Sequence, residues 1–283
     1  MEVDEASLSR NGEPSEDAED DAQDSVTELL EELTRQLGTL AFYEARLAAE
    51  RNKPRVRRAA RDAAAAAVVG VAFLTAFALL NTMGQATTDA VETVWGLKLP
   101  GDAIQGVDHA GQTAMRITRE LLRAAGLADD EIDPHLGRWC AEASHRYLKL
   151  LADADTSHWA AAAGAADALR RIEHRALLTG NPEPVARARM ERIGLAELFP
   201  PGQGAFGCEA ESRPELISIA RRKAGDWPAD RTVAVGDTPT DVSGARAAGI
   251  RVVGFGAGLD DADAVIESMS ELPSTLDRLS AGT

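Results

Sequence analysis

The sequence predicts an α/β protein with a Rossmann-like parallel sheet and a separate helical region, preceded by a helical segment that has the length of a membrane span. Three observations support this prediction. Two apolar runs in the second half of the chain end in polar residues and lead into helical patterns. Apolar residues recur at helical spacing over residues 106–158, and no charged residue lies between Asp62 and Asp89.

The amino-terminal part is predicted to be disordered at first and then helical. Residues 1–25 are rich in acidic and small polar residues and hold almost no large apolar side chain, so they cannot bury enough surface to fold. From Val26 to Tyr43, apolar residues recur mainly three or four positions apart, which predicts an amphipathic helix. A basic stretch from Arg46 to Arg61 follows this helix.

The uncharged stretch after the basic joint predicts a membrane helix over residues 63–84. As a helix it would be about 33 Å long, which matches a hydrocarbon core of roughly 30 Å. Its many alanines contribute little to insertion, so a buried helix of a soluble bundle is the alternative. The adjacent arginines favour the membrane. By the positive-inside rule, arginines before a single span would place the carboxyl-terminal domain outside the cytoplasm. An amphipathic or re-entrant helix in the membrane interface would keep that domain inside. The interfacial helix is favoured, so the expected location is the membrane with the carboxyl-terminal domain on the cytoplasmic face, or otherwise the cytoplasm.

Residues 25–90 resemble the holin-superfamily-III membrane proteins of actinobacteria. The resemblance rests on a leucine-rich helix containing LGTLAFYEARLAAE, an arginine-rich joint and a span of Ala, Val and Leu. Those proteins usually carry two spans. Residues 91–105 are too short and too polar for a second span and are interpreted as a linker.

The most specific motif lies in residues 232–258, which read TVAVGDTPTDVSGARAAGIRVVGFGAG. An apolar run ends in Gly-Asp, a second acid follows four residues later, and a helical pattern leads into another apolar run. This order predicts a βαβ unit with Asp237 and Asp241 at the carboxyl end of a strand, where open α/β sheets bind their ligands. Asp241 is also well placed to cap the following helix.

This segment resembles motif IV of the haloacid dehalogenase (HAD) superfamily, in which two acids help to hold Mg2+. The resemblance implies that Asp237 and Asp241 are metal ligands. The family has a basic residue, usually Lys followed by Pro, about two dozen positions before the motif IV acid. Arg213-Pro214 occupies that place here, and its guanidinium can grip a phosphate bidentately. A solvated surface arginine is the alternative interpretation of Arg213.

A second motif follows the apolar run from Ala176 to Leu178, which ends in Thr179, Gly180 and Asn181 ahead of a helical pattern. A hydroxyl and backbone N–H groups at a helix N-terminus suit the oxygens of a phosphate. The segment resembles HAD motif II, which implies that Thr179 is the phosphate-binding hydroxyl. Taken alone, these three residues are also ordinary turn residues.

Residues 106–158 are predicted to form helices and residues 159–283 the α/β core. The helical part resembles the cap that phosphoglycolate-phosphatase-like HAD members insert after their first strand, with Gly111-Gln112-Thr113 matching the start of that cap. Such a cap closes over a substrate and excludes water. An unrelated helical pair is the alternative.

The first motif of the family has no counterpart. It is an apolar strand ending in Asp-x-Asp-Gly-Thr, in which the first Asp attacks phosphorus and the second acts as general acid and base. The nearest text here is Asp108-His109-Ala110-Gly111, where Ala110 replaces the second Asp, so Asp108 is not assigned as a nucleophile. The sheet is expected to lack its central strand, and residues 94–99 (VWGLKL) are the only local candidate to fill the gap.

Composition excludes some functions. A formal net charge of −16 argues against nucleic-acid partners, because a phosphate backbone needs clustered positive charge. Cys140 and Cys208 lie far apart with no CxxC spacing, so neither a zinc site nor a disulfide is expected. Both are interpreted as buried thiols in a reducing compartment.

The sequence supports hypotheses of different classes. The first is a HAD-type, Mg2+-dependent phosphohydrolase domain that binds a small phosphorylated metabolite through Thr179, Gly180, Asn181 and Arg213. Its activity is expected to be lost or weak because the nucleophile is absent. The second is a membrane-tethered scaffold without chemistry, and holin-like pore formation is a third. Phosphate release from an aryl phosphate with Mg2+ separates the first two.

Overall fold

The computed structural model describes residues 66–69, 76–100, 102–107 and 111–281. These residues belong to one compact unit that spans residues 64–283, and residues 1–63 are assigned to a second unit. The acidic tail, the amphipathic helix and the basic joint predicted for residues 1–62 all fall outside the described residues.

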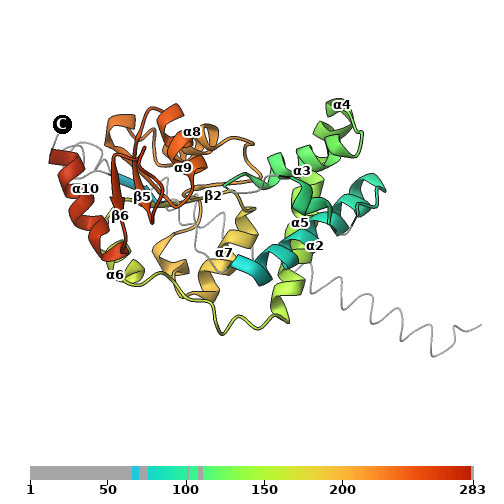
Figure 1. Ribbon diagram of the computed structural model, residues 1–283, viewed down its shortest axis with the longest axis horizontal. Helices are drawn as coiled ribbons and strands as arrows, with labels where there is room; N and C mark the ends of the chain where they lie inside the picture. Colours follow the sequence, from blue (N-terminus) through green and yellow to red (C-terminus); the bar gives the residue numbers. More distant parts are fainter. Residues whose placement is uncertain (1–65, 70–75, 101, 108–110, 282–283) are drawn as a thin grey trace, which may run out of the picture. The chain divides into compact units, whose positions relative to one another are not determined.

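A parallel sheet of six strands forms the centre of the described fold, in the order β3-β2-β1-β4-β5-β6 (Figure 1). Each strand runs parallel to its neighbours. The predicted α/β class is therefore confirmed. The strands are β1 (Ala66–Val69), β2 (Arg175–Thr179), β3 (Ala205–Phe206), β4 (Thr232–Gly236), β5 (Arg251–Phe255) and β6 (Ala264–Ile266).

The central strand that was expected to be missing is present. β1 lies between β2 and β4, and Val69 pairs with Leu177 on one side and with Val235 on the other. Residues 94–99 do not fill this place, because helix α2 (Ala76–Trp95) runs into them. The prediction of an incomplete sheet is wrong for a physical reason. A central parallel strand is buried on both faces, so its sequence is an unbroken apolar run that resembles a membrane or core helix.

The membrane helix predicted over residues 63–84 is corrected by the same finding. Residues 66–69 of that stretch form β1, and α2 begins only at Ala76. None of the helices within the described ranges combines the length and the apolar character that crossing a bilayer requires. The holin-like resemblance falls largely outside those ranges and gains no support from the fold.

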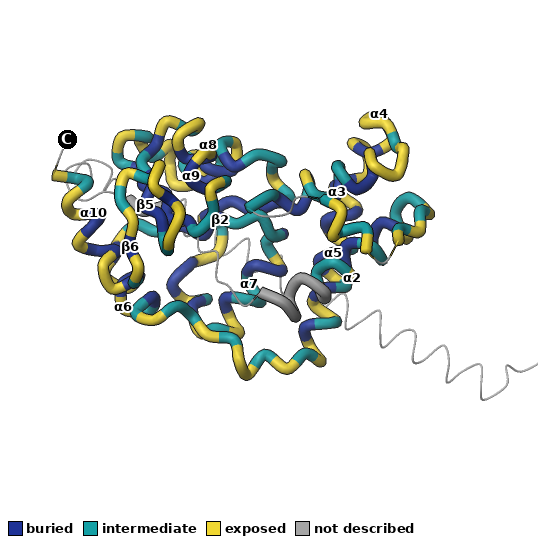
Figure 2. The backbone as a smooth tube through the Cα atoms, viewed as in Figure 1, coloured by how far each residue is buried: buried dark blue, intermediate teal, exposed yellow. Residues whose placement is uncertain are grey.

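Helices cover both faces of the sheet. Side chains alternate along each strand, so Leu177 and Val235 contribute to an apolar cluster on one face, and Leu178 and Ala234 to a cluster on the other. Figure 2 shows β2 and β5 as mostly buried. The first cluster includes residues of α6 (Ala165–Arg170), α7 (Glu183–Arg192) and α10 (Leu272–Ala281), and the second includes residues of α8 (Arg213–Lys223) and α9 (Pro239–Ala247).

A helical unit between β1 and β2 lies beside the sheet (Figure 1). α2 packs along α5, and the fully buried Trp139 and Leu122 lie in the apolar cluster that joins the helices of this unit. The boundary that the sequence analysis placed at residue 90, between the amino-terminal segment and the linker, falls inside α2. The division of the chain into domains stays a prediction. The unit comprises α2, η2 (Ala103–Gly106), α3 (Ala114–Ala124), α4 (Asp129–Ile132), η3 (Asp133–His135) and α5 (Leu136–Ala152); the remaining short helices are η4 (Ala196–Leu198), η5 (Ala229–Arg231) and η6 (Met269–Glu271).

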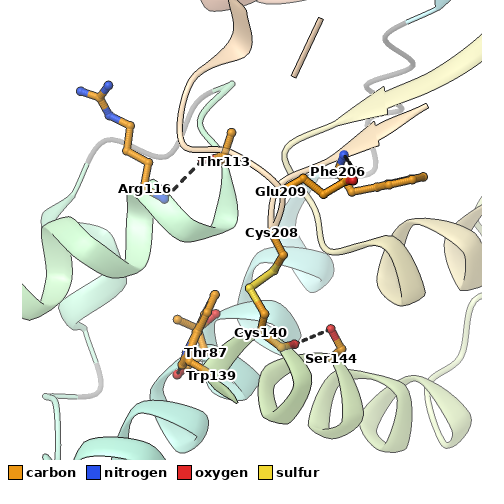
Figure 3. The surroundings of a disulfide bond; sticks show 9 residues. All are labelled: Thr87, Thr113, Arg116, Trp139, Cys140, Ser144, Phe206, Cys208 and Glu209. Atoms are coloured by element: carbon orange, nitrogen blue, oxygen red, sulfur yellow. Dashed lines mark hydrogen bonds between the residues drawn. A yellow bond between two sulfur atoms is a disulfide. The ribbon is translucent and has the colours of Figure 1, made fainter. Parts of the chain in front are cut away.

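The two cysteines form a disulfide, which the sequence did not lead us to expect. Cys140 lies on α5 and Cys208 follows β3, with their Cα atoms 6.1 Å apart (Figure 3). Their interpretation as free buried thiols is therefore wrong. A spacing of 68 residues carries no information about proximity until the fold is known.

Candidate functional site

The two predicted metal-binding acids follow the carboxyl end of β4. Asp237 comes directly after Gly236, and Asp241 occupies the third position of helix α9. Thr238 caps this helix: its hydroxyl donates to Asp241 Oδ2 at 2.7 Å, and its backbone N–H donates to the same oxygen at 3.2 Å. The Asp241 N–H in turn donates to the Thr238 hydroxyl at 3.2 Å. Asp241 is thus buried and held in one orientation by a capping box.

Gly236 allows Asp241 to approach the strand end. A Cβ atom at position 236 would lie 2.3 Å from the Asp241 Cβ and 2.6 Å from its Cγ. Real Cβ atoms do not approach other atoms so closely, so any other residue would push the carboxylate away. This contact gives a physical reason for the Gly-Asp pair that the sequence shows at this place.

Arg213 joins this site from the first turn of α8. Its side chain is 9% exposed, its Nε donates to the carbonyl of Gly111 at 3.0 Å, and its Nη2 lies 3.3 Å from Asp241 Oδ1. The structure therefore brings Arg213 and Asp241 together, and the interpretation of Arg213 as a solvated surface residue is wrong. Its buried Nη1 has no hydrogen-bond partner among the described residues. A buried guanidinium N–H without a partner is available to an anion.

Asp237 carries a buried acceptor, whereas Arg213 carries a buried donor. Its buried Oδ1 lacks a hydrogen-bond partner in the described part of the chain. Burial, together with the nearby negative charge of Asp241, raises the pKa of Asp237 to about 6, although Arg213 opposes the shift. The positive charge of Arg213 therefore does not fully compensate the negative charge of ionised Asp237.

Thr179 lies at the same level of the sheet as Asp237. Leu177 and Val235 both pair with Val69 of β1, and Thr179 and Asp237 each lie two residues further along. The two polar residues therefore flank the carboxyl end of β1, at roughly twice the spacing of neighbouring strands, or about 10 Å. This edge is where an open parallel sheet binds its ligands.

The loop after Thr179 is preorganised. The Thr179 hydroxyl oxygen accepts hydrogen bonds from the backbone N–H and the side-chain amide of Asn181, at 3.2 and 3.1 Å. A hydroxyl has one proton, and both of these contacts use the oxygen as an acceptor, so within the described part of the chain the proton remains available for a ligand. A Cβ at Gly180 would lie 2.1 Å from the Gln112 carbonyl oxygen, which explains a glycine at this position.

The segment Gly111-Gln112-Thr113 passes between these parts of the site. Gly111 has a φ of +67°, and a Cβ there would lie 2.6 Å from the Thr238 hydroxyl. Its carbonyl binds Arg213, and the next helix begins with the Ala114 N–H donating to Gly180 at 2.7 Å. The segment that leads into α3 is therefore in contact with the loops that carry the predicted site residues.

No carboxylate is available from the strand at the centre of the site. β1 ends at Val69, and the sequence contains no acidic residue between Ala63 and Thr88. Asp108, which was not assigned as a nucleophile, lies outside the described residues. That the two acids of the first family motif are absent therefore stays a prediction from the sequence.

Sequence reasoning missed two contributors to this site. Thr238 orients Asp241, and the Thr-x-x-Asp spacing of a capping box was a signal that could have identified it. Gly207 accepts a hydrogen bond from the Met115 N–H at 3.1 Å and donates one to Asn181 at 2.8 Å. No local pattern marks Gly207, because its role depends on segments that meet only in the fold.

The geometry is compatible with a divalent cation, although only in part. Within the described residues no three acidic, histidine or cysteine side chains gather into a metal-binding group. Asp237 offers a buried oxygen without a partner, and a cation beside it would offset its desolvation and the repulsion from Asp241. Mg2+ commonly uses one or two carboxylates together with water and phosphate. Asp241 already contacts Arg213, so a metal would depend mainly on Asp237.

Solved structures with the same fold include several HAD proteins. CbbY from Rhodobacter sphaeroides in complex with phosphate has 18% identity and a TM-score of 0.52, and the match covers 75% of this chain and 99% of that chain. An aspartate-to-asparagine mutant of CbbY in complex with xylulose-(1,5)bisphosphate has 18% identity and a TM-score of 0.51, with 74% and 96% covered. A family IA, variant 3 HAD hydrolase from Entamoeba histolytica has 14% identity and a TM-score of 0.52, with 76% and 99% covered.

The family assignment rests on the sequence match. No curated protein matches the chain. The structural similarities lie below 25% identity, so they establish the fold alone. The family described as haloacid dehalogenase-like hydrolase matches residues 38–249, which is most of the 283-residue chain. The chain therefore belongs to the haloacid dehalogenase-like hydrolase family.

Proposed function

We propose that this HAD-family domain binds a small phosphorylated metabolite and Mg2+, and that its phosphomonoester hydrolysis is lost or severely weakened. The observation that carries the proposal is the nature of β1. It occupies the centre of the sheet, between the strands that bear Thr179 and Asp237, yet no carboxylate follows it in the sequence before Asp89. Without the nucleophile, the covalent route to hydrolysis is closed.

Binding does not need the missing acids. Among the described residues, Arg213 has a buried N–H without a partner, and the Thr179 hydroxyl accepts two hydrogen bonds and keeps its proton for a ligand. These groups, with the backbone of Gly180 and Asn181, suit the oxygens of a phosphate dianion. The mutant CbbY shows that a protein of this fold can hold a sugar bisphosphate after one aspartate has been replaced.

The catalytic part is tested with p-nitrophenyl phosphate and Mg2+. We expect the full chain to release p-nitrophenol at the background rate and Asp108→Asn to change nothing. Asp can also be introduced at positions 70 to 75, one at a time and in pairs two positions apart. These variants test whether the rest of the site can support hydrolysis once a carboxylate is supplied. A robust Mg2+-dependent activity of the unmodified chain that Asp108→Asn abolishes would overturn the proposal.

The binding part is tested by calorimetry with inorganic phosphate. We expect phosphate binding to be lost in Arg213→Met and weakened in Thr179→Val. The matched control is Arg138→Met, which changes an exposed arginine and should bind phosphate as the parent does. Absence of phosphate binding in a folded parent chain would reject this part and favour a scaffold role.

The metal part is tested by thermal unfolding. A ligand that binds only the folded state raises the melting temperature by mass action. We expect Mg2+ to raise it for the parent and not for the double variant Asp237→Asn, Asp241→Asn. Asp130→Asn, an exposed acid on the helical unit, should respond as the parent does. An unchanged Mg2+ response in the double variant would remove the metal assignment.

A further inference from the structure

The disulfide joins two different parts of the domain. Cys140 lies in the amino-terminal half of α5, within the helical unit, whereas Cys208 belongs to the loop between β3 and α8 in the α/β core (Figure 3). Cys208 packs against the apolar cluster of the helical unit, although its own segment leaves the sheet. The bond is therefore a covalent connection between the helical unit and the core.

The loop that carries Cys208 is also part of the candidate site. Its preceding residue, Gly207, donates a hydrogen bond to the Asn181 carbonyl at 2.8 Å, and a Cβ at Gly207 would lie 1.7 Å from the Gly180 oxygen. The core end of the disulfide is thus one residue away from a segment in tight backbone contact with the predicted phosphate-binding loop.

A non-covalent contact lies three residues from Cys208, the core end of the disulfide. Glu211 receives two charge-assisted hydrogen bonds from Arg119 Nε, at 2.8 and 2.9 Å, and its backbone carbonyl accepts from the buried Thr113 hydroxyl at 3.0 Å. Residues 207–212, here called the docking loop, therefore contact the helical unit through the disulfide, through the Arg119–Glu211 ion pair and through hydrogen bonds from Thr113 and Met115.

The two halves of α5 are held differently. In the carboxyl-terminal half, the fully buried Tyr147 packs with Val185 of α7, and its hydroxyl accepts from Arg189 at 2.9 Å. The Leu151 carbonyl accepts from Arg192 at 3.1 Å. The amino-terminal half has Cys140 as its covalent link to the core. Breaking that link leaves the carboxyl-terminal half docked on α7.

We propose that the Cys140–Cys208 disulfide is a redox-controlled clamp on the helical unit. A dithiol reductant attacks one sulfur, leaves as its own disulfide, and supplies two electrons and two protons, so that two cysteine thiols replace the S–S bond. Cys208 is partly exposed whereas Cys140 is buried, so Cys208 is the more accessible end of the bond. Reduction then releases the amino-terminal half of α5, and α2 with it, from the docking loop.

Hydrogen exchange of the full chain measures this release directly. After reduction with dithiothreitol, amide exchange is expected to become at least about tenfold faster in residues 83–95 and 136–143, because local opening no longer meets a covalent restraint. Exchange in residues 147–152 and in α8 and α9 should stay as it was. Cys140→Ala and Cys208→Ala, each alone, should exchange like the reduced parent and should not respond to dithiothreitol.

Two outcomes would overturn the clamp. Exchange that is unchanged by reduction of the unmodified chain would show that the disulfide restrains nothing, and this result needs no variant to fold. A uniform increase over both the helical unit and the core would show a general staple rather than a clamp. The experiment uses neither phosphate nor metal, so its outcome is independent of the proposed function.

Discussion

Asp237 gives the site a pH dependence whose sign can be derived. Its pKa lies near 3.8 in an ordinary environment and is raised to about 6 in the folded chain. Between those values the folded chain keeps a proton that the unfolded chain has lost. The free energy of unfolding therefore falls as the pH rises from about 4 to about 6, and the loss is complete above that window.

Asp237→Asn should remove this fall when unfolding by urea is measured at pH 4 to 8 in EDTA. Two pKa units correspond to roughly 3 kcal/mol, and partial solvent exposure reduces the expected gain of the variant at pH 7.5 to roughly 1 to 2 kcal/mol. Asp260→Asn, an exposed acid, should follow the parent at every pH. If Asp237→Asn keeps the parent's slope, the buried carboxyl is not its source.

Arg213 is predicted to matter for stability as well as for binding. Arg213→Ala removes the partner of a buried Asp241 and the donor to the Gly111 carbonyl. Loss of one partner of a buried ion pair costs about 3 kcal/mol or more. Urea unfolding should show that loss, whereas Arg246→Ala, which removes a half-exposed arginine paired with Asp263, should cost less than about 1 kcal/mol. Equal effects of the two variants would contradict the buried pair.

The sequence was informative about which residues meet at the site. Strand ends marked by Thr179 and Asp237 could be predicted to share one edge, because parallel strands align their carboxyl ends. Family spacing predicted that Arg213 belongs to the same site as Asp241, but it did not predict the contact between them. The partners Gly111 and Gly207 could not be predicted, because their contacts are made by backbone atoms from distant segments. The roles of all these residues in binding stay predictions.

At the scale of an element, β1 offers a test by a single proline. Val68 pairs with Ala176 and with Ala234, so its backbone lies between two strands. Proline cannot donate to a ladder and is excluded from central strands, so Val68→Pro should destabilise the domain by about 3 kcal/mol or more in urea.

The matched control at this position is Val68→Ala, which keeps the N–H and should cost clearly less. A membrane helix would tolerate proline better than a central strand does. Unchanged stability of Val68→Pro would therefore place these residues outside the sheet.

The elements differed in how well the sequence predicted them. β2, β4 and β5 were recognisable because each apolar run is short and is followed by turn residues, which are polar after β2 and β4 and glycine-rich after β5. β1 was hidden because alanines before it and apolar residues after it extend the run to the length of a membrane span. Periodicity cannot separate a strand buried on both faces from a buried helix.

For the whole molecule, residues 64–283 should fold alone. They form one compact unit with a complete sheet that is covered on both faces. A chain that begins at Ala64 is therefore expected to unfold cooperatively, with a melting temperature within about 4 °C of the full chain, which corresponds to less than about 2 kcal/mol. A chain that begins at Ala76 and so lacks β1 should fail to fold cooperatively. Equal behaviour of the two truncated chains would contradict a structural role for β1.

The connection between the helical unit and the core was beyond sequence reasoning. The helices themselves follow from periodicity, but the disulfide and the Arg119–Glu211 pair join segments separated by 68 and 92 positions. Pairings of this kind depend on topology, which a single sequence does not reveal.

The position of β1 has a consequence for synthesis on the ribosome. The strand is translated before either neighbour, since β2 and β4 follow about 110 and about 165 residues later. At about 5 to 20 residues per second, the second neighbour emerges roughly 10 to 30 s after β1. For that time an apolar segment has neither of its hydrogen-bonding partners, and unpaired strand edges of this kind favour aggregation until translation has passed β4.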